Sequence, residues 1–87
     1  MIGQKLRELR EEKGLLQKDI ANFLNISTSA YGYYEQGKRN PDIEILGKLA
    51  DFFNVSTDYL LGKTNVKNTL KYDYEYQIKF ETFSFRI

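Results

Sequence analysis

The 87-residue sequence contains no cysteine and no histidine. Without them the chain has no disulfide, no thiol nucleophile and none of the usual zinc ligand sets. We therefore expect no catalytic or metal-binding residue and no cofactor. Acidic residues such as Asp19 and Glu44 fall on ordinary solvated helix faces, so an enzyme is the least favoured functional class.

Long apolar runs and an excess of one charge are also missing. No segment approaches the about 20 apolar residues of a membrane span, and residues 1–13 are charged and periodic rather than signal-like. We expect a cytoplasmic protein without a membrane partner. The 13 basic and 12 acidic residues nearly cancel, so net charge indicates no nucleic-acid partner by itself and the placement of charges must decide.

The composition changes near Lys63. All six glycines and the one proline lie at or before Gly62. Apolar residues recur at helical spacing before this point and alternate after it. A chain of this length has room for one core. We predict an all-α domain over residues 1–63, followed by a C-terminal β-strand extension over residues 64–87.

Before Lys63 the sequence contains three residues typical of a helix start and five typical of a helix end. Good N-caps are Ser27, Asp42 and Ser56, and residues suited to a left-handed helix end are Gly14, Asn25, Gly37, Asn54 and Gly62. The predicted helices run from Ile2 toward Gly14, from Gln17 to Leu24, from Ser27 to about Gln36, from Ile43 to Phe53, and from Ser56 to Gly62. The fourth carries an apolar stripe of Ile43, Leu46, Leu49, Ala50 and Phe53.

The second and third predicted helices are joined by a short turn through Asn25 and Ile26. Two short helices joined in this way, the second opened by a hydroxyl cap, can present a helix N-terminus to the DNA major groove. Helical bundles without DNA contain similar corners. The spacing therefore leaves DNA binding and a purely structural corner both open.

The residues themselves resemble a known family. The Cro/repressor-type (Xre-like) helix-turn-helix pattern is matched from Ile2 to Gly62 by Ile2-Gly3, Leu6-Arg7, Gly14, Gln17, Ala21, Leu24, Ser27, Tyr34-Glu35, Gly37-Lys38-Arg39, Pro41, Leu49-Ala50 and Val55-Ser56. The resemblance implies a five-helix, lambda-repressor-like DNA-binding domain. It also implies a transcriptional regulator of the repressor type that binds a double-stranded operator as a homodimer. Asn25, Tyr31 and Asn54 depart from common family choices in ways that turns and core can absorb.

The third predicted helix separates into two faces when projected at about 100° per residue. Ala30, Tyr31 and Tyr34 point inward, and the residues predicted to contact bases are Thr28, Ser29, Gly32 and Tyr33. Gly32 indicates either a close approach of backbone to DNA or mere tolerance of glycine. Because Arg, Asn and Gln are missing from this set, base selection would depend on methyl contacts, water and DNA shape.

Phosphate contacts are predicted from both ends of the motif. The residues are Gln17, Ser27, Gln36, Lys38, Arg39 and Asn40. Gln17 opens a helix whose positive end attracts phosphate, and the resemblance implies the same role. A plain helix-start residue and a solvated basic loop are the alternatives. Glu35 faces partly inward and needs a partner, for which the resemblance suggests Arg10.

The C-terminal segment alternates apolar and polar residues from Leu70. The aromatic strand is predicted to mediate dimerisation through Tyr72, Tyr74, Tyr76, Ile78, Phe80, Phe83 and Phe85. A lone strand with such a face needs a partner. The partner could be a second copy, a hairpin on the same domain, or a different protein as in an antitoxin, and a mobile tail is the remaining alternative. An interaction module with secondary DNA binding is thus the competing function.

Overall fold

A computed structural model describes residues 2–67 of the chain. This range contains five helices: α1 (Ile2–Glu12), α2 (Gln17–Leu24), α3 (Thr28–Gln36), α4 (Ile43–Phe53) and α5 (Thr57–Leu60). The predicted helical domain is therefore confirmed over these residues. The strand predicted from Leu70 and its dimerisation residues lie outside the described residues.

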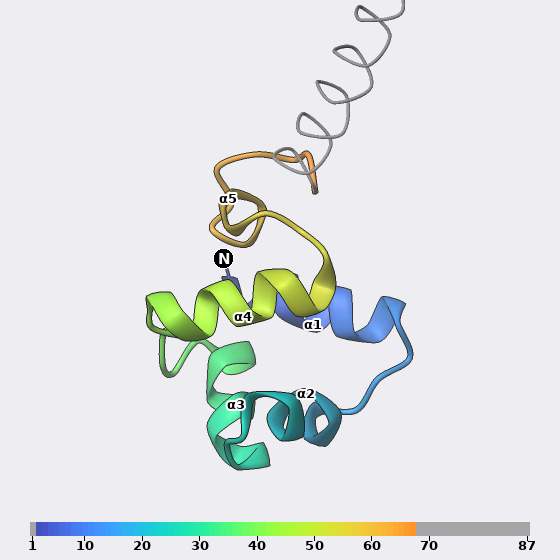
Figure 1. Cartoon of the computed structure of the whole chain (residues 1–87), viewed down its shortest axis with the longest axis vertical. Helices are drawn as coiled ribbons and strands as arrows, with labels where there is room; N and C mark the ends of the chain where they lie inside the picture. Colours follow the sequence, from blue (N-terminus) through green and yellow to red (C-terminus); the bar gives the residue numbers. More distant parts are fainter. Residues whose placement is uncertain (1, 68–87) are drawn as a thin grey trace, which may run out of the picture.

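Helices α1 and α4 form a central pair, and the other three helices lie on either side of it. Figure 1 shows α1 and α4 across the middle of the domain, with α2 and α3 below them and α5 above. The recognition candidate α3 packs against α1 and α2, whereas α5 packs against α4 and α1. This arrangement leaves α2 and α3 at one end of the domain.

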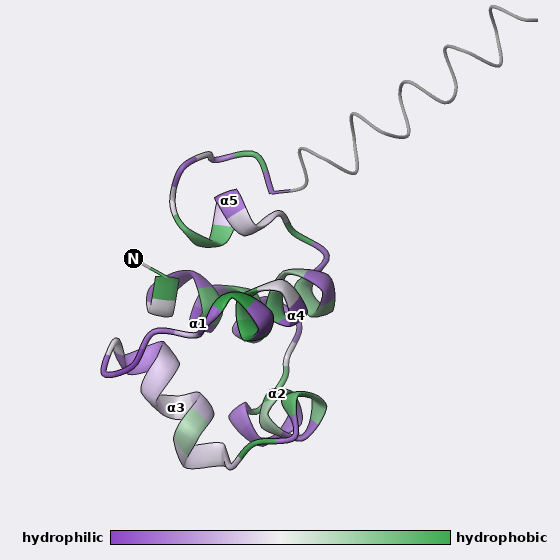
Figure 2. Ribbon diagram, turned by 60° about the vertical axis from the view of Figure 1, so that its left-hand side comes forward, coloured by the Kyte–Doolittle hydropathy of each residue, from purple (hydrophilic) through white to green (hydrophobic). Residues whose placement is uncertain are grey.

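Each helix contributes a completely buried, large hydrophobic side chain to a single core. These side chains are Leu6, Ile20, Tyr31, Leu49 and Leu60. The hydropathy colouring of Figure 2 shows green residues on α4 and a pale α3, which buries tyrosine and glycine rather than aliphatic residues. The core therefore holds α3 mainly through aromatic contacts, including an edge-to-face pair of Tyr31 and Tyr34 with centroids 6.3 Å apart.

The helix ends follow the predicted caps. The hydroxyl oxygen of Ser27 accepts from the Ala30 amide at 3.0 Å, and Asp42 and Ser56 cap α4 and α5 in the same way. Asn25 adopts a left-handed conformation with φ 59° after α2, and Asn54 does so with φ 56° after α4. Asparagine tolerates this region better than most residues, so both turns form without glycine.

One part of the predicted apolar stripe of α4 is wrong. Ile43 is 89% exposed, whereas Leu49, Ala50 and Phe53 are buried as predicted and Leu46 is partly buried. Ile43 is the first helical residue after the Asp42 cap, where α4 has just begun. Helical spacing continues to this position, but the core beneath the helix does not.

The described chain continues in contact with the domain beyond α5. The Lys67 carbonyl oxygen accepts a hydrogen bond from the Ser56 amide at 2.6 Å. The Lys67 ammonium lies 3.1 Å from the Glu12 carboxylate. Residues up to Lys67 thus tie the start of α5 to the end of α1. Within the described range, none of the helices has the length and apolar character needed to traverse a membrane.

Candidate nucleic-acid interface

The turn between α2 and α3 sets the angle at which α3 leaves the domain. Asn25 takes the left-handed conformation, and the Ile26 amide donates to the Ala21 carbonyl at 3.0 Å, which closes the end of α2. Ile26 packs partly buried against the core. The predicted placement of both residues is confirmed, and Thr28 and Ser29 follow at the exposed start of α3.

Three of the four predicted base-contacting side chains are exposed. Thr28 and Ser29 are exposed on the first turn of α3, and Tyr33 is 41% exposed one turn later. The Lys38 ammonium lies 5.8 Å from the centroid of the Tyr33 ring. A cation over an aromatic face is favourable, so the basic loop after α3 stays near this exposed ring.

Gly32 does not share this outward orientation, so that part of the helical projection is wrong. Gly32 is buried. A Cβ at this position would lie 3.4 Å from the Gln17 amide oxygen and 3.8 Å from the Gln36 amide nitrogen. These are ordinary contact distances to the ends of two flexible side chains, so packing within the domain does not by itself require glycine here.

Glu35 accepts three hydrogen bonds from two residues on two other helices. Arg10 donates to both carboxylate oxygens, at 2.7 and 3.1 Å, and also to the Leu15 carbonyl at 3.0 Å. The Gln17 side-chain amide donates to the same carboxylate at 3.2 Å. The predicted pairing of Glu35 with Arg10 is confirmed, and it joins α1, α2 and α3 at one point.

The Glu35 cluster is buried enough to matter for stability. The Glu35 side chain is completely buried and that of Arg10 is 14% exposed. Burial acts to raise the pKa of Glu35, but interactions with Arg10, and then with Tyr31 and Gln17, outweigh it and hold the pKa below its ordinary value. Glu35 is therefore ionised at neutral pH, in a structural rather than catalytic role.

Tyr31 adds a buried hydroxyl beside this cluster. Burial first, and then the nearby Glu35 carboxylate, raises the pKa of Tyr31, so the phenol stays protonated. Within residues 2–67, its hydroxyl has no partner in hydrogen-bonding geometry. Tyr31 thus packs as a core residue, as predicted, with its hydroxyl close to the Glu35 carboxylate.

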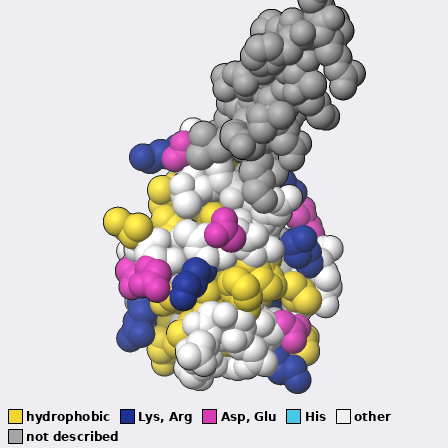
Figure 3. All heavy atoms as spheres, in the orientation of Figure 1, with side chains coloured by type: hydrophobic (Ala, Val, Ile, Leu, Met, Phe, Trp, Pro, Cys, Tyr) yellow, Lys and Arg dark blue, Asp and Glu magenta, His cyan; other side chains and the backbone are white. Residues whose placement is uncertain are grey.

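The predicted phosphate-contacting residues are mostly accessible. Ser27, Gln36, Lys38, Arg39 and Asn40 are exposed and Gln17 is partly buried. The Ser27 oxygen is occupied by its cap, and one Gln17 side-chain amide hydrogen by Glu35. On the face shown in Figure 3, basic and acidic side chains are interspersed. This face therefore offers no broad basic patch.

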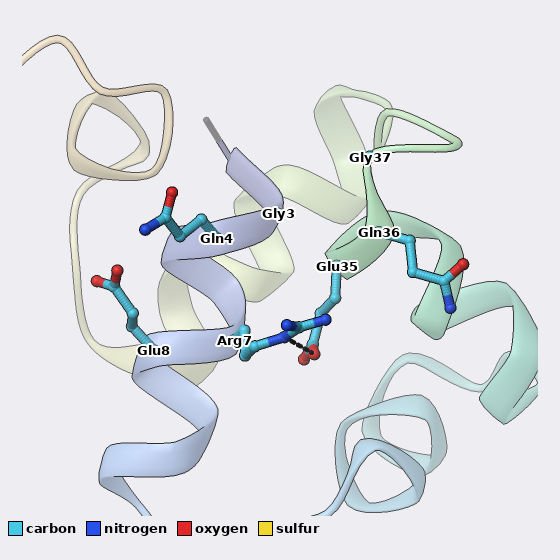
Figure 4. A pocket seen from close by; sticks show the side chains of 7 residues that line it. All are labelled: Gly3, Gln4, Arg7, Glu8, Glu35, Gln36 and Gly37. Atoms are coloured by element: carbon cyan, nitrogen blue, oxygen red, sulfur yellow. Dashed lines mark ion pairs between the residues drawn. The ribbon is translucent and has the colours of Figure 1, made fainter.

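One basic residue near Glu35 was not predicted. The Arg7 Nε atom lies 3.7 Å from Glu35, although its side chain is 53% exposed. In Figure 4 its guanidinium reaches from α1 toward α3, across an open cleft. The residues that line the cleft are Gly3, Gln4, Arg7, Glu8, Glu35, Gln36 and Gly37. Its spacing from Arg10 places Arg7 near the same face of α1, but only the structure shows its distance to Glu35.

Comparison with known proteins places this geometry in a family. Residues 6–60 match the helix-turn-helix family. The HTH-type transcriptional regulator ImmR of Bacillus subtilis is 46% identical over 65 residues, which cover 75% of this chain and 51% of ImmR. The cryptic phage CTXphi transcriptional repressor RstR of Vibrio cholerae is 36% identical over 82% of this chain and 66% of RstR.

A solved structure of a relative contains DNA. The biofilm regulator SinR in complex with DNA superposes with a TM-score of 0.64 at 32% identity, covering 70% of this chain and 98% of that one. The antitoxin PezA of Streptococcus pneumoniae is 31% identical over 93% of this chain and 51% of PezA. The chain thus spans about half the length of ImmR and PezA. Because the family match covers most of the domain, the chain belongs to the Xre-like helix-turn-helix family of transcriptional regulators.

Proposed function

We propose that this chain is a sequence-specific, cytoplasmic regulator of the repressor type that inserts α3 into the major groove of double-stranded DNA. The observation that carries the proposal is the contrast between the two faces of α3. Its inward face is fixed by the core and by Glu35, while Thr28, Ser29 and Tyr33 are exposed. A rigid helix with free side chains on one face is what groove recognition requires. The SinR–DNA complex, a structure with the same fold, supports this assignment.

The exposed side chains of α3 are short or aromatic, and this limits the base contacts that they can make. Thr28 and Ser29 can hydrogen-bond base edges, and the Thr28 methyl and Tyr33 ring can pack on thymine methyl groups. These contacts discriminate less strongly than bidentate Arg, Asn or Gln contacts. Gly32, the fourth residue of the proposed set, lies beside the Gln17 side chain and offers only its backbone to a base.

Phosphate contacts would hold α3 in the groove from both sides. Gln17 opens α2, whose first amides point out of the helix, and Lys38, Arg39 and Asn40 leave α3 on exposed backbone. Ser27 and Gln36 complete the proposed set at the two ends of α3. This set surrounds the exposed base-reading face, which is how phosphate contacts set the register of a recognition helix.

The base-reading proposal is tested by selecting duplexes from a random pool and measuring their affinity. A Thr28→Ala/Ser29→Ala/Tyr33→Ala variant is expected to lose about 100-fold in affinity for the selected duplex, since base contacts contribute about 1–3 kcal/mol each. Its affinity for random DNA should change little. The control is Thr57→Ala/Asn65→Ala, which alters polar residues near α5. Unchanged selection by the triple variant would contradict the assignment of α3.

Dimerisation through the aromatic segment is the second part of the proposal. Residues 70–87 supply the alternating aromatic pattern, and a paired strand would present two copies of α3. Two half-sites about 34 Å apart, one helical turn of DNA, would then be bound together. The match to PezA extends over 93% of the chain and favours an alternative in which this segment binds a partner protein, as in an antitoxin.

Truncation after Lys67 separates these two roles, because it keeps the contacts of Lys67 with Ser56 and Glu12. We expect the truncated chain to sediment as a monomer and the full chain as a dimer. The monomer should bind one half-site weakly and lose the high affinity for the paired site. A full chain that is itself monomeric, and binds the paired site no more tightly than the truncated chain, would contradict dimerisation and favour the partner-protein role.

A further inference from the structure

Helix α1 approaches α3 closely enough to bring its own side chains beside the proposed recognition helix. A Cβ on Gly3 would lie 2.5 Å from the Glu35 carbonyl oxygen and 2.6 Å from that of Tyr34. Arg7 lies one turn further along α1, on the same face as Gly3. The absence of a side chain at Gly3 therefore lets the following turn of α1 reach α3.

The Glu35 carboxylate is already paired with Arg10, so the positive charge of Arg7 is left unbalanced. Arg10 already makes two hydrogen bonds to the Glu35 carboxylate, at 2.7 and 3.1 Å, and Gln17 makes a third. Arg7 approaches only through Nε, at 3.7 Å, with 53% of its side chain exposed. Two guanidinium groups and one carboxylate sum to a charge of +1. Arg7 thus has donors available for a further anion.

The cleft around Arg7 suits a polymer backbone better than a small molecule. Its volume of about 540 Å³ is within the range of ligand pockets, but it is open and none of its lining residues is aromatic. Gln36, a proposed phosphate contact, lines the same cleft. Glu8 also lines it, but Figure 4 shows its carboxylate, like the Gln4 amide, directed away from α3.

We propose that Arg7 binds a backbone phosphate of the DNA, so that the interface extends from the helix-turn-helix onto α1. The inference rests on the proposed function. Glu35 lies 3.7 Å from the Arg7 Nε atom and holds this guanidinium beside the C-terminal end of α3 without neutralising it. Because the 13 basic and 12 acidic residues of this chain nearly cancel, one added cation contributes a measurable share of the affinity.

The salt dependence of DNA binding tests this proposal. Arg7→Gln should reduce the slope of log affinity against log salt by about 0.9, because one phosphate is no longer neutralised. Between 50 and 200 mM salt, the advantage of the wild-type chain should therefore fall by about 3.5-fold. Arg7→Lys should keep most of the slope. The control Lys63→Gln removes an exposed cation near α5 and should leave the slope unchanged.

Three outcomes distinguish the possible failures. If Arg7→Gln weakens binding equally at both salt concentrations, Arg7 only supports the fold and the proposal is overturned. If its slope matches that of the wild-type chain while Lys38→Gln/Arg39→Gln lowers the slope, α1 lies outside the interface but the proposed function stands. If no variant changes the slope and no duplex is selected, the proposed function itself fails. Thermal unfolding of every variant reports whether the fold is retained.

Discussion

Replacing Arg10 by methionine is expected to lower the free energy of unfolding by about 3 kcal/mol, because the buried Glu35 charge loses its main partner. The Glu35 side chain is completely buried and Arg10 supplies two of its hydrogen bonds. Gln17 and Arg7 remain beside Glu35, so the expected loss of stability lies at the lower end of the range observed when buried ion pairs are broken. In a domain of this size the melting temperature should fall by about 12–24 °C, which calorimetry measures directly.

Two matched variants separate the pair from general effects of charge removal. Lys48→Met breaks the exposed pair with Glu44, whose atoms lie 3.5 Å apart, and should cost about 0.5 kcal/mol or less. The double variant Arg10→Met/Glu35→Leu should recover most of the loss, since it leaves no unpaired buried charge. An equal decrease in the free energy of unfolding for Arg10→Met and Lys48→Met would show that the buried pair contributes no more to stability than the exposed pair.

The pH dependence of unfolding gives a second readout of the same pair. The pKa of Glu35 is lower in the folded chain than in the unfolded chain, where it is about 4.3. Its contribution is therefore complete above the unfolded pKa and is lost as pH falls through the folded one. The free energy of unfolding should decline below about pH 4.3, and Glu35→Gln should make that decline shallower.

Replacing Gly3 by alanine is expected to destabilise the domain by about 1–3 kcal/mol, although alanine is the better helix former. The added Cβ would meet two backbone carbonyl oxygens of α3, at 2.5 and 2.6 Å, and neither atom can rotate away. Helices α1 and α3 would have to separate, which also lengthens the contacts of Arg7 and Arg10 with Glu35. Urea unfolding measures the change in stability.

Gly47 provides the matched control for this prediction. It also lies within a helix, α4, but a Cβ there would have no atom within 4 Å. Gly47→Ala should therefore stabilise the domain by about 0.5–1 kcal/mol, through helix propensity alone. If both substitutions change stability in the same direction, the contact of α1 with α3 is less tight than the structure indicates.

The helix boundaries could be predicted because their signals are local. A hydroxyl or carboxylate at Ser27, Asp42 or Ser56 caps the residue three positions later, and a left-handed Asn25 needs only its neighbours. Ile43 was misjudged because spacing shows which face of a helix is apolar but not how far the core extends beneath it. That extent depends on where the other helices end.

In the candidate site, too, some features could be predicted before the structure and others depend on packing. The partner of Glu35 was available from family resemblance, since Arg10 is 25 residues away and no spacing rule connects them. The burial of Gly32 depends on how the Gln17 side chain crosses from α2, which only the packed structure shows. Arg7 was missed for a similar reason, because a surface arginine becomes informative only when its distance to Glu35 is known.

The exposed start of α3 has a consequence for how such a regulator can change its target. Among the residues described, the side chains of Thr28 and Ser29 are exposed and make no hydrogen bond or ion pair, and the Tyr33 ring, 41% exposed, makes a cation–π contact with Lys38. Substitutions there need no compensation in the core. Under the proposed function, mutation could move the chain from one operator to another in single steps, each leaving a folded protein, while the buried contacts of α3 stay the same.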